Sequence, residues 1–93
     1  MTRSALALLV CAAALGQAGN SKDAARAKLG DGIAAYDRGD FAGALAAFEE
    51  AYRLYPSPKL LVNQATCHAK LGHPDEALAL YERFLADPGN APA

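Results

Sequence analysis

The sequence predicts an all-α fold of four helices, arranged as two tandem helix–turn–helix units. Three observations lead to this expectation. No segment alternates apolar and polar residues with a period of two, as a half-buried strand would. Apolar side chains recur three or four residues apart in four segments, which glycine and proline residues separate. The second pair of segments also repeats the first after 33 residues, because residues 72–82 match residues 39–49 in their glycine, Ala-Leu-Ala and final glutamate.

The first helix is predicted over residues 21–38, where spacings of four and three place Leu29, Ile33 and Tyr36 on one face. Gly39 follows directly, and glycine in the left-handed conformation commonly ends a helix. We therefore expect a tight turn at Gly39.

The second helix is predicted over residues 41–55, with Asp40 as its capping residue. Its apolar residues again fall three or four positions apart: Phe41, Leu45, Phe48 and Tyr52. Two local ion pairs are expected on the helical surfaces, Glu49 with Arg53 and Glu82 with Arg83.

Pro56, Ser57 and Pro58 end the second helix and open the third, with Ser57 as N-cap and proline at the first helical position. The third helix then runs to about Leu71, and Gly72 repeats the turn. The fourth helix starts at Pro74 and continues to the Pro-Gly pair at 88–89, and residues 89–93 are expected to form a flexible tail.

Size and charge exclude several classes of protein. The chain has 93 residues, of which 23 are alanine and none is tryptophan, so one small domain with a thin core is the most it can form. An enclosed enzyme cavity is not expected at this size. Nine basic against ten acidic side chains give a net charge of −1, whereas a phosphate-binding surface shows a basic excess. We therefore expect no nucleic-acid partner.

Residues 1–18 have the pattern of a secretory signal peptide. Arg3 supplies a positive charge, Ala5–Leu15 is an unbroken run of eleven apolar residues, and Gly16–Ala18 offers small residues for cleavage. A membrane span needs about 20 apolar residues, so we expect export to the periplasm or cell envelope, with no membrane span in the mature chain. Acylation of Cys11, as in a lipoprotein, is the alternative.

The two units resemble the tetratricopeptide repeat (TPR) family, as an exported bacterial-type protein with two repeats. The resemblance covers residues 22–88, with repeats at about 25–57 and 58–88. It rests on small residues at helix crossings, turn glycines, an alanine followed four residues later by an aromatic residue, and a closing proline: Gly32, Gly39, Ala44, Phe48 and Pro56, then Ala65, Gly72, Ala77 and Tyr81. The family's Trp and Leu positions are occupied differently, by Lys28 and Asp31 in the first repeat and by Leu61 and Gln64 in the second.

The resemblance implies a fragment of a right-handed α-solenoid whose concave face binds a peptide or partner protein. The first helix of each repeat would line that face with Arg26, Leu29, Ile33, Tyr36, Asp37, Lys59, Val62, Asn63, Thr66 and Lys70. Leu29, Ile33 and Val62 could equally be packing residues. The implied function is that of a non-enzymatic scaffold or adaptor in an envelope assembly, with no cofactor.

Two alternative functions stay open: a self-associating structural protein, or a small metal- or redox-responsive protein that uses Cys67, His68 and His73. Adjacent helical residues diverge by about 100°, so one ion would not easily bind both Cys67 and His68. Neither CxxC nor HExxH spacing is present. We expect Cys67 to be a small core residue, with no metal site and no catalytic residue.

The last predicted helix has no neighbour on one side. Repeat arrays generally need about three units and a polar cap, and Leu78, Tyr81, Phe84 and Leu85 would here remain uncovered. Three explanations stay open: a homodimer through this helix, docking onto a partner, or a sequence that is one piece of a longer protein.

Overall fold

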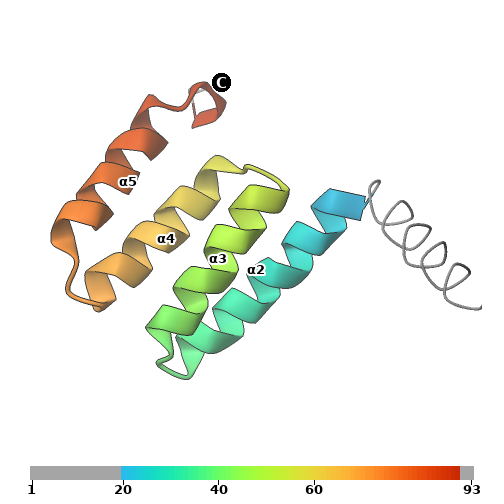
Figure 1. Ribbon diagram of the computed structural model, residues 1–93. Helices are drawn as coiled ribbons and strands as arrows, with labels where there is room; N and C mark the ends of the chain where they lie inside the picture. The colour runs from blue at the N-terminus through green and yellow to red at the C-terminus, as the bar shows by residue number, and fades with distance from the viewer. Residues whose placement is uncertain (1–19, 91–93) are drawn as a thin grey trace, which may run out of the picture.

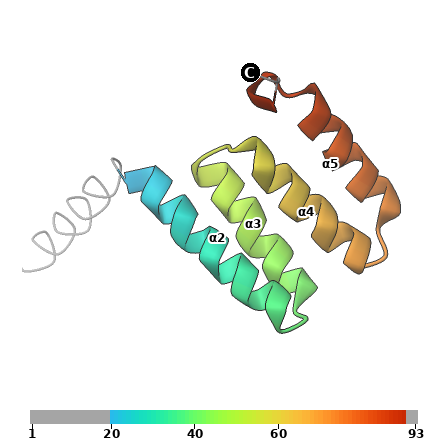
Figure 2. The ribbon, with the colours of Figure 1, turned by 180° about the vertical axis from the view of Figure 1, so that it is seen from behind.

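The computed structural model describes residues 20–90, which form four α-helices and a short 3-10 turn. The helices follow one another as an antiparallel row (Figures 1 and 2). Their bounds are α2 at Ser21–Asp37, α3 at Phe41–Leu54, α4 at Pro58–Lys70, α5 at Pro74–Ala86 and η2 at Pro88–Asn90. No strand occurs within these described residues, so the all-α prediction is confirmed. The expected signal peptide lies outside them.

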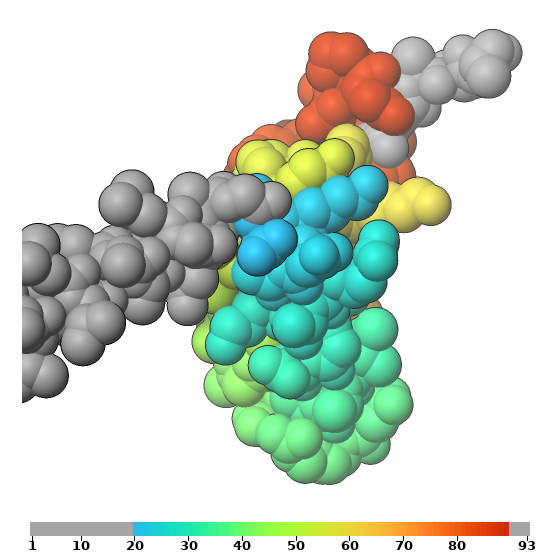
Figure 3. All heavy atoms as spheres, turned by 90° about the vertical axis from the view of Figure 1, so that its right-hand side faces the viewer, coloured from blue at the N-terminus to red at the C-terminus, as the bar shows by residue number. Residues whose placement is uncertain are grey.

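Each helix packs against the next one in the chain, and contact is more extensive within a pair, α2 with α3 and α4 with α5, than between the pairs. Seen from the α2 end, the molecule is a narrow stack with the C-terminal turn at the top, behind α2 (Figure 3). This arrangement is that of two helix–turn–helix units laid side by side, as the 33-residue repeat indicates.

Both turns within a pair close in the same way. Gly39 and Gly72 have φ values of +82° and +80°, in the left-handed region. In the first turn the N–H of Asp40 donates to the carbonyl of Ala35 at 2.9 Å; in the second the N–H of His73 makes the equivalent bond at 2.8 Å. These are the bonds of a Schellman motif, which satisfies carbonyls at a helix end.

Capping differs between the helices. The Asp40 carboxylate accepts a hydrogen bond from the N–H of Gly43 at 2.9 Å, as expected for an N-cap. Ser57 occupies the N-cap position of α4, but its hydroxyl makes no capping bond, and Leu60 donates to the Ser57 carbonyl instead. Ser57 is therefore the N-cap residue of α4, as predicted, but its side chain does not supply the capping bond.

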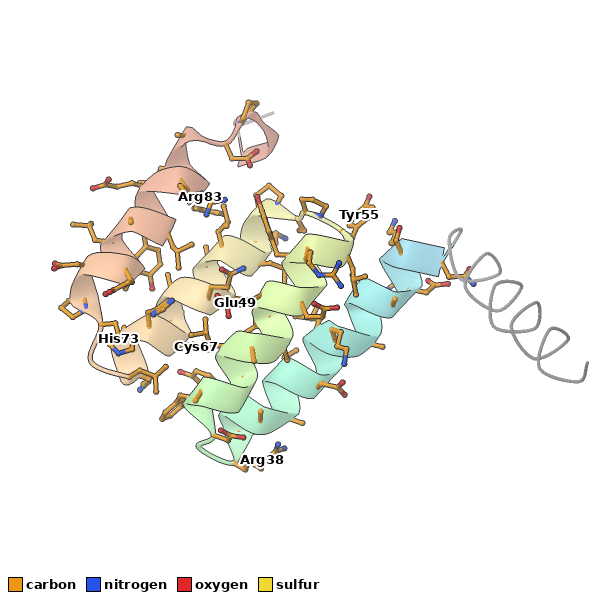
Figure 4. The ribbon with its side chains drawn as sticks, in the orientation of Figure 1. Arg38, Glu49, Tyr55, Cys67, His73 and Arg83 are labelled. Atoms are coloured by element: carbon orange, nitrogen blue, oxygen red, sulfur yellow. The ribbon has the colours of Figure 1, made fainter. Side chains whose placement is uncertain are left out.

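The two expected ion pairs are wrong. Arg53 pairs with Glu50, three residues before it, and the bidentate contact lowers the pKa of the Glu50 carboxyl. Arg83 reaches across the stack to α3, where its guanidinium donates to the Tyr52 hydroxyl at 3.5 Å and lies 5.8 Å from the ring centroid. Figure 4 shows Arg83 on the side of α5 that faces α4.

Alanine dominates the core. The buried cluster consists of five small side chains and two larger ones: Ala25, Ala35, Ala44, Ala51 and Cys67, with Phe48 and Leu60. Gly32 is also buried, and a Cβ placed on it would lie 2.5 Å from the Phe48 ring. The absence of a side chain at Gly32 therefore lets α2 and α3 approach closely around that ring.

One buried polar side chain and the C-terminal turn complete the description of the fold. Gln64 is 6% exposed, and its amide nitrogen has no hydrogen-bond partner among the described residues. Gly89, the first residue of the predicted tail, lies in η2, where its N–H donates to the Asp87 carboxylate at 2.8 Å. Residues 91–93 lie outside the described range.

Candidate partner-binding groove

A groove runs along the face that α2 and α4 share. Its first hollow, of about 270 Å³, is lined by Ile33, Tyr36, Asp37, Phe48, Asn63 and Thr66. Its second hollow, of about 220 Å³, is lined by Lys22, Ala25, Arg26, Leu29, Tyr55, Ser57, Lys59, Leu60 and Asn63. Asn63 belongs to both, so the hollows adjoin. We call them together the α2–α4 groove.

The first hollow combines an exposed apolar side chain with hydrogen-bonding groups. Ile33 is 49% exposed, although isoleucine is usually buried. Phe48, packed against the backbone of α2, belongs to the hollow's lining. The hydroxyl of Thr66 donates to the carbonyl of Val62 at 2.9 Å and lies 3.5 Å from the Tyr81 hydroxyl. A ligand would therefore meet both an apolar contact and polar partners here.

The second hollow is bordered by cations. Lys22 and Arg26 come from α2 and Lys59 from α4, whereas no acidic residue lines this hollow. The Lys22 ammonium lies 5.6 Å from the ring centroid of Tyr55, a cation–π distance. Figure 4 shows Tyr55 at the end of α3, close to the start of α2. The groove thus has a basic end and, at Asp37, an acidic one.

Eight of the ten residues that the sequence suggested for the concave face line this groove: Arg26, Leu29, Ile33, Tyr36, Asp37, Lys59, Asn63 and Thr66. Val62 and Lys70 do not. Val62 is half-buried beside the groove, and the Lys70 ammonium lies 6.0 Å from the ring centroid of Phe41. Whether the groove binds a partner remains a prediction.

Sequence reasoning missed several lining residues. Lys22 lies four residues before Arg26, so helical spacing could have placed it on the same face. Tyr55 and Ser57 belong to the connection between the repeats, where no periodicity predicts the direction of a side chain.

The cysteine and the histidines do not form one cluster. Cys67 is fully buried, and burial raises the pKa of its thiol. His68 and His73 face each other, with their Nδ1 atoms 3.2 Å apart, and His73 lies in the turn before α5 (Figure 4). Within residues 20–90, no group of three or more His, Cys, Asp or Glu side chains is arranged to hold a metal ion.

Three apolar or aromatic side chains of α5 are exposed. Leu78, Tyr81 and Leu85 are 58%, 37% and 77% exposed. The 33-residue repeat aligns them with Leu45, Phe48 and Tyr52 of α3, which are buried or half-buried. Because α4 packs against α3, α3 has a neighbouring helix that α5 does not have within residues 20–90.

The family model of the tetratricopeptide repeat matches residues 3–59 and 29–92. The chain therefore belongs to the tetratricopeptide repeat family. Stacked repeats of this kind form extended concave surfaces that bind other proteins, so the chain is a protein–protein interaction module. No helix in residues 20–90 is long and apolar enough to span a membrane.

Two curated relatives are the photosystem I assembly proteins Ycf3 of Prochlorococcus marinus strains MIT 9303 and MIT 9313. Each is 37% identical over 67 residues, which cover 68% of this chain. The chain spans 39% of the length of either relative. No solved structure matches the chain.

Proposed function

We propose that the protein is a non-enzymatic scaffold or adaptor whose α2–α4 groove binds an extended peptide segment of a partner protein. The two adjoining hollows of the groove carry this proposal, because both apolar side chains and hydrogen-bonding groups line them. An extended peptide presents both kinds of group to a groove. The 49% exposure of Ile33 supports the same role, since a partner would cover it.

We further propose that this scaffold works in the cell envelope. The signal-peptide pattern of residues 1–18 supports export. The relatives are named for the assembly of photosystem I, and we extend to this chain only the general role of assisting the assembly of another complex. Expression of the full chain in a bacterium, followed by fractionation and mass measurement, tests the location. A protein that keeps residues 1–18 and stays in the cytoplasm would contradict it.

Peptide binding is tested by selecting phage-displayed random dodecapeptides on the immobilised full chain. We expect selected peptides to bind the wild type and to lose at least tenfold in affinity for the double variant Ile33→Ala/Asn63→Ala. Both side chains lie in the groove and outside the buried core, so circular dichroism should show an unchanged fold. The control is Lys28→Ala, which is exposed and lines neither hollow. Equal binding to both variants would place the site elsewhere.

A second contact surface is proposed on α5, with a second copy of the chain as its occupant. The exposed Leu78, Tyr81 and Leu85 carry this proposal. Sedimentation velocity of the full chain over a concentration series should show a dimer, and Leu85→Glu should shift it to a monomer. A wild-type monomer at high concentration rules out the homodimer.

A further inference from the structure

The cations at the basic end of the groove form no ion pairs among the described residues. Lys22, Arg26 and Lys59 line the second hollow, and none of them forms an ion pair within residues 20–90. The ion pairs of this part of the chain use other cations: Lys28 with Asp31, Arg38 with Asp40, and Arg53 with Glu50. The whole chain has ten acidic residues and a net charge of −1, yet none of its described carboxylates lines this hollow. The three cations of this hollow are therefore free of direct ion pairs within the described part of the chain.

The hollow between these cations has an apolar floor. Ala25 and Leu60 are each 6% exposed and belong to the packed core, so the floor is held in place by the fold. Leu29, half-buried, and the ring of Tyr55 complete it. A floor of this kind accepts an apolar side chain of a ligand. The surrounding cations favour negatively charged groups next to that apolar side chain.

The adjoining hollow limits how far negative charge can extend. Asp37 lines it beside the neutral groups of Asn63 and Thr66. A polyanion that followed the whole groove would bring its charges against the Asp37 carboxylate. This arrangement disfavours a nucleic-acid backbone, whose charges repeat along its length, and favours a ligand with acidic groups at one end only.

We propose that the partner segment is an acidic–apolar peptide, an inference that rests on the proposed function of the groove. Its apolar side chain, of leucine or phenylalanine type, fills the second hollow. Aspartate or glutamate side chains next to it in the sequence face Lys22, Arg26 and Lys59. The remainder of the segment continues past Asn63 into the first hollow, where uncharged or basic residues lie near Asp37.

The test uses a synthetic dodecapeptide array in which each peptide has one central leucine or phenylalanine, flanked on one side by Glu, Gln or Lys. Fluorescence anisotropy of the full chain with the labelled peptides should rank Glu above Gln above Lys. We expect about a tenfold difference between the extremes at low salt, since exposed ion pairs contribute modestly one by one. The preference should shrink as salt rises.

Charge reversal supplies the matched comparison. Arg26→Glu/Lys59→Glu should invert the preference toward the Lys peptides. The control Lys28→Glu/Arg38→Glu changes the net charge equally but lies outside the groove, so it should keep the preference for Glu. Inversion by both variants would mean that net charge alone decides, and the inference would be wrong.

Failure of the inference is distinct from failure of the proposed function. Peptides that bind without any preference for Glu, and that lose affinity with Ile33→Ala/Asn63→Ala, leave the groove as the binding site and overturn the acidic partner. If phage selection yields no groove-dependent peptide and the array shows no binding, both proposals fall. A short duplex DNA that displaces the Glu peptide at a lower concentration than unlabelled peptide does would also overturn the inference.

Discussion

The close contact between Gly32 and Phe48 predicts that adding one methyl group at position 32, by Gly32→Ala, changes the stability of the fold. A Cβ on Gly32 would lie 2.5, 2.7 and 3.0 Å from three carbons of the Phe48 ring. Atoms of this kind do not approach to 2.5 Å, so either the ring or the helix must move. Phe48 is only 4% exposed, so its ring can yield only toward the first hollow, which it lines. Gly32→Ala therefore forces either α2 away from α3 or the Phe48 ring out of its packed position.

The size of the effect follows from two opposing terms. Alanine favours a helix over glycine by about 1 kcal/mol, which stabilises the variant. Overpacking a core costs about 1–3 kcal/mol, which destabilises it. Gly30, in the same helix, is exposed, and a Cβ on it would meet no neighbouring side chain or helix within 4 Å, so Gly30→Ala gains only the first term. We expect Gly30→Ala to be more stable than Gly32→Ala by about 1–3 kcal/mol.

Urea unfolding followed by circular dichroism at 222 nm measures the difference. In a domain of this size, about 1 kcal/mol corresponds to a shift of about 4–8 °C in Tm, so thermal melts give a second measurement. Phe48→Leu should restore part of the lost stability when combined with Gly32→Ala, because it removes ring atoms that meet the methyl group. Equal stability of Gly30→Ala and Gly32→Ala would refute the close packing of α2 on Phe48.

Three further predictions use the same measurements or simple chemistry. Asp40→Ala should cost about 0.5–2 kcal/mol through loss of its capping bond, whereas Ser57→Ala should cost little because its hydroxyl makes no such bond; equal losses in urea unfolding would contradict the capping difference. Gln64→Leu should stabilise the fold by about 1–3 kcal/mol, since it removes a buried amide nitrogen without a partner; a destabilised variant would reveal a missing partner. Burial raises the pKa of the Cys67 thiol and keeps it protonated. Iodoacetamide should therefore modify Cys67 only after unfolding, or in the native state only at a higher pH than an ordinary thiol requires. Rapid labelling of the native protein at neutral pH, detected by mass spectrometry, would argue against its burial.

The order of the helices could be predicted from the sequence because local chemistry decides it. Gly39 and Gly72 adopt the left-handed conformation that side chains disfavour, and Pro58 and Pro74 begin helices where a missing N–H costs nothing. Side-chain partners were less predictable. Arg53 could reach a carboxylate three or four residues before it, and only the rotamers of the folded helix select Glu50.

The position of the groove was partly predictable for a similar reason. Helical spacing puts Arg26, Leu29 and Ile33 on one side of α2, and all three line the groove. Its edges depend on how the two repeats are joined, and Tyr55 enters the second hollow from that connection. Helical spacing places Lys70 on the same side of α4 as the groove residues. Lys70 is however the last residue of α4, and its ammonium lies near the ring of Phe41 at the start of α3. At this helix end, contact with a neighbouring side chain determines where the Lys70 ammonium lies, and helical spacing alone does not predict it.

Similarity between the repeats predicts equal structure but not equal burial. Phe48 and Tyr81 occupy equivalent positions 33 residues apart, and they are 4% and 37% exposed. The difference arises from their neighbours, because α4 packs against α3 while no helix of residues 20–90 follows α5 in the row. The aromatic side chain in each repeat is therefore suited to packing under a following helix, and within residues 20–90 only Phe48 has one. A homodimer through α5 satisfies this requirement only if the two copies cover Leu78, Tyr81 and Leu85 together, which is why a single charged residue at Leu85 is expected to separate them.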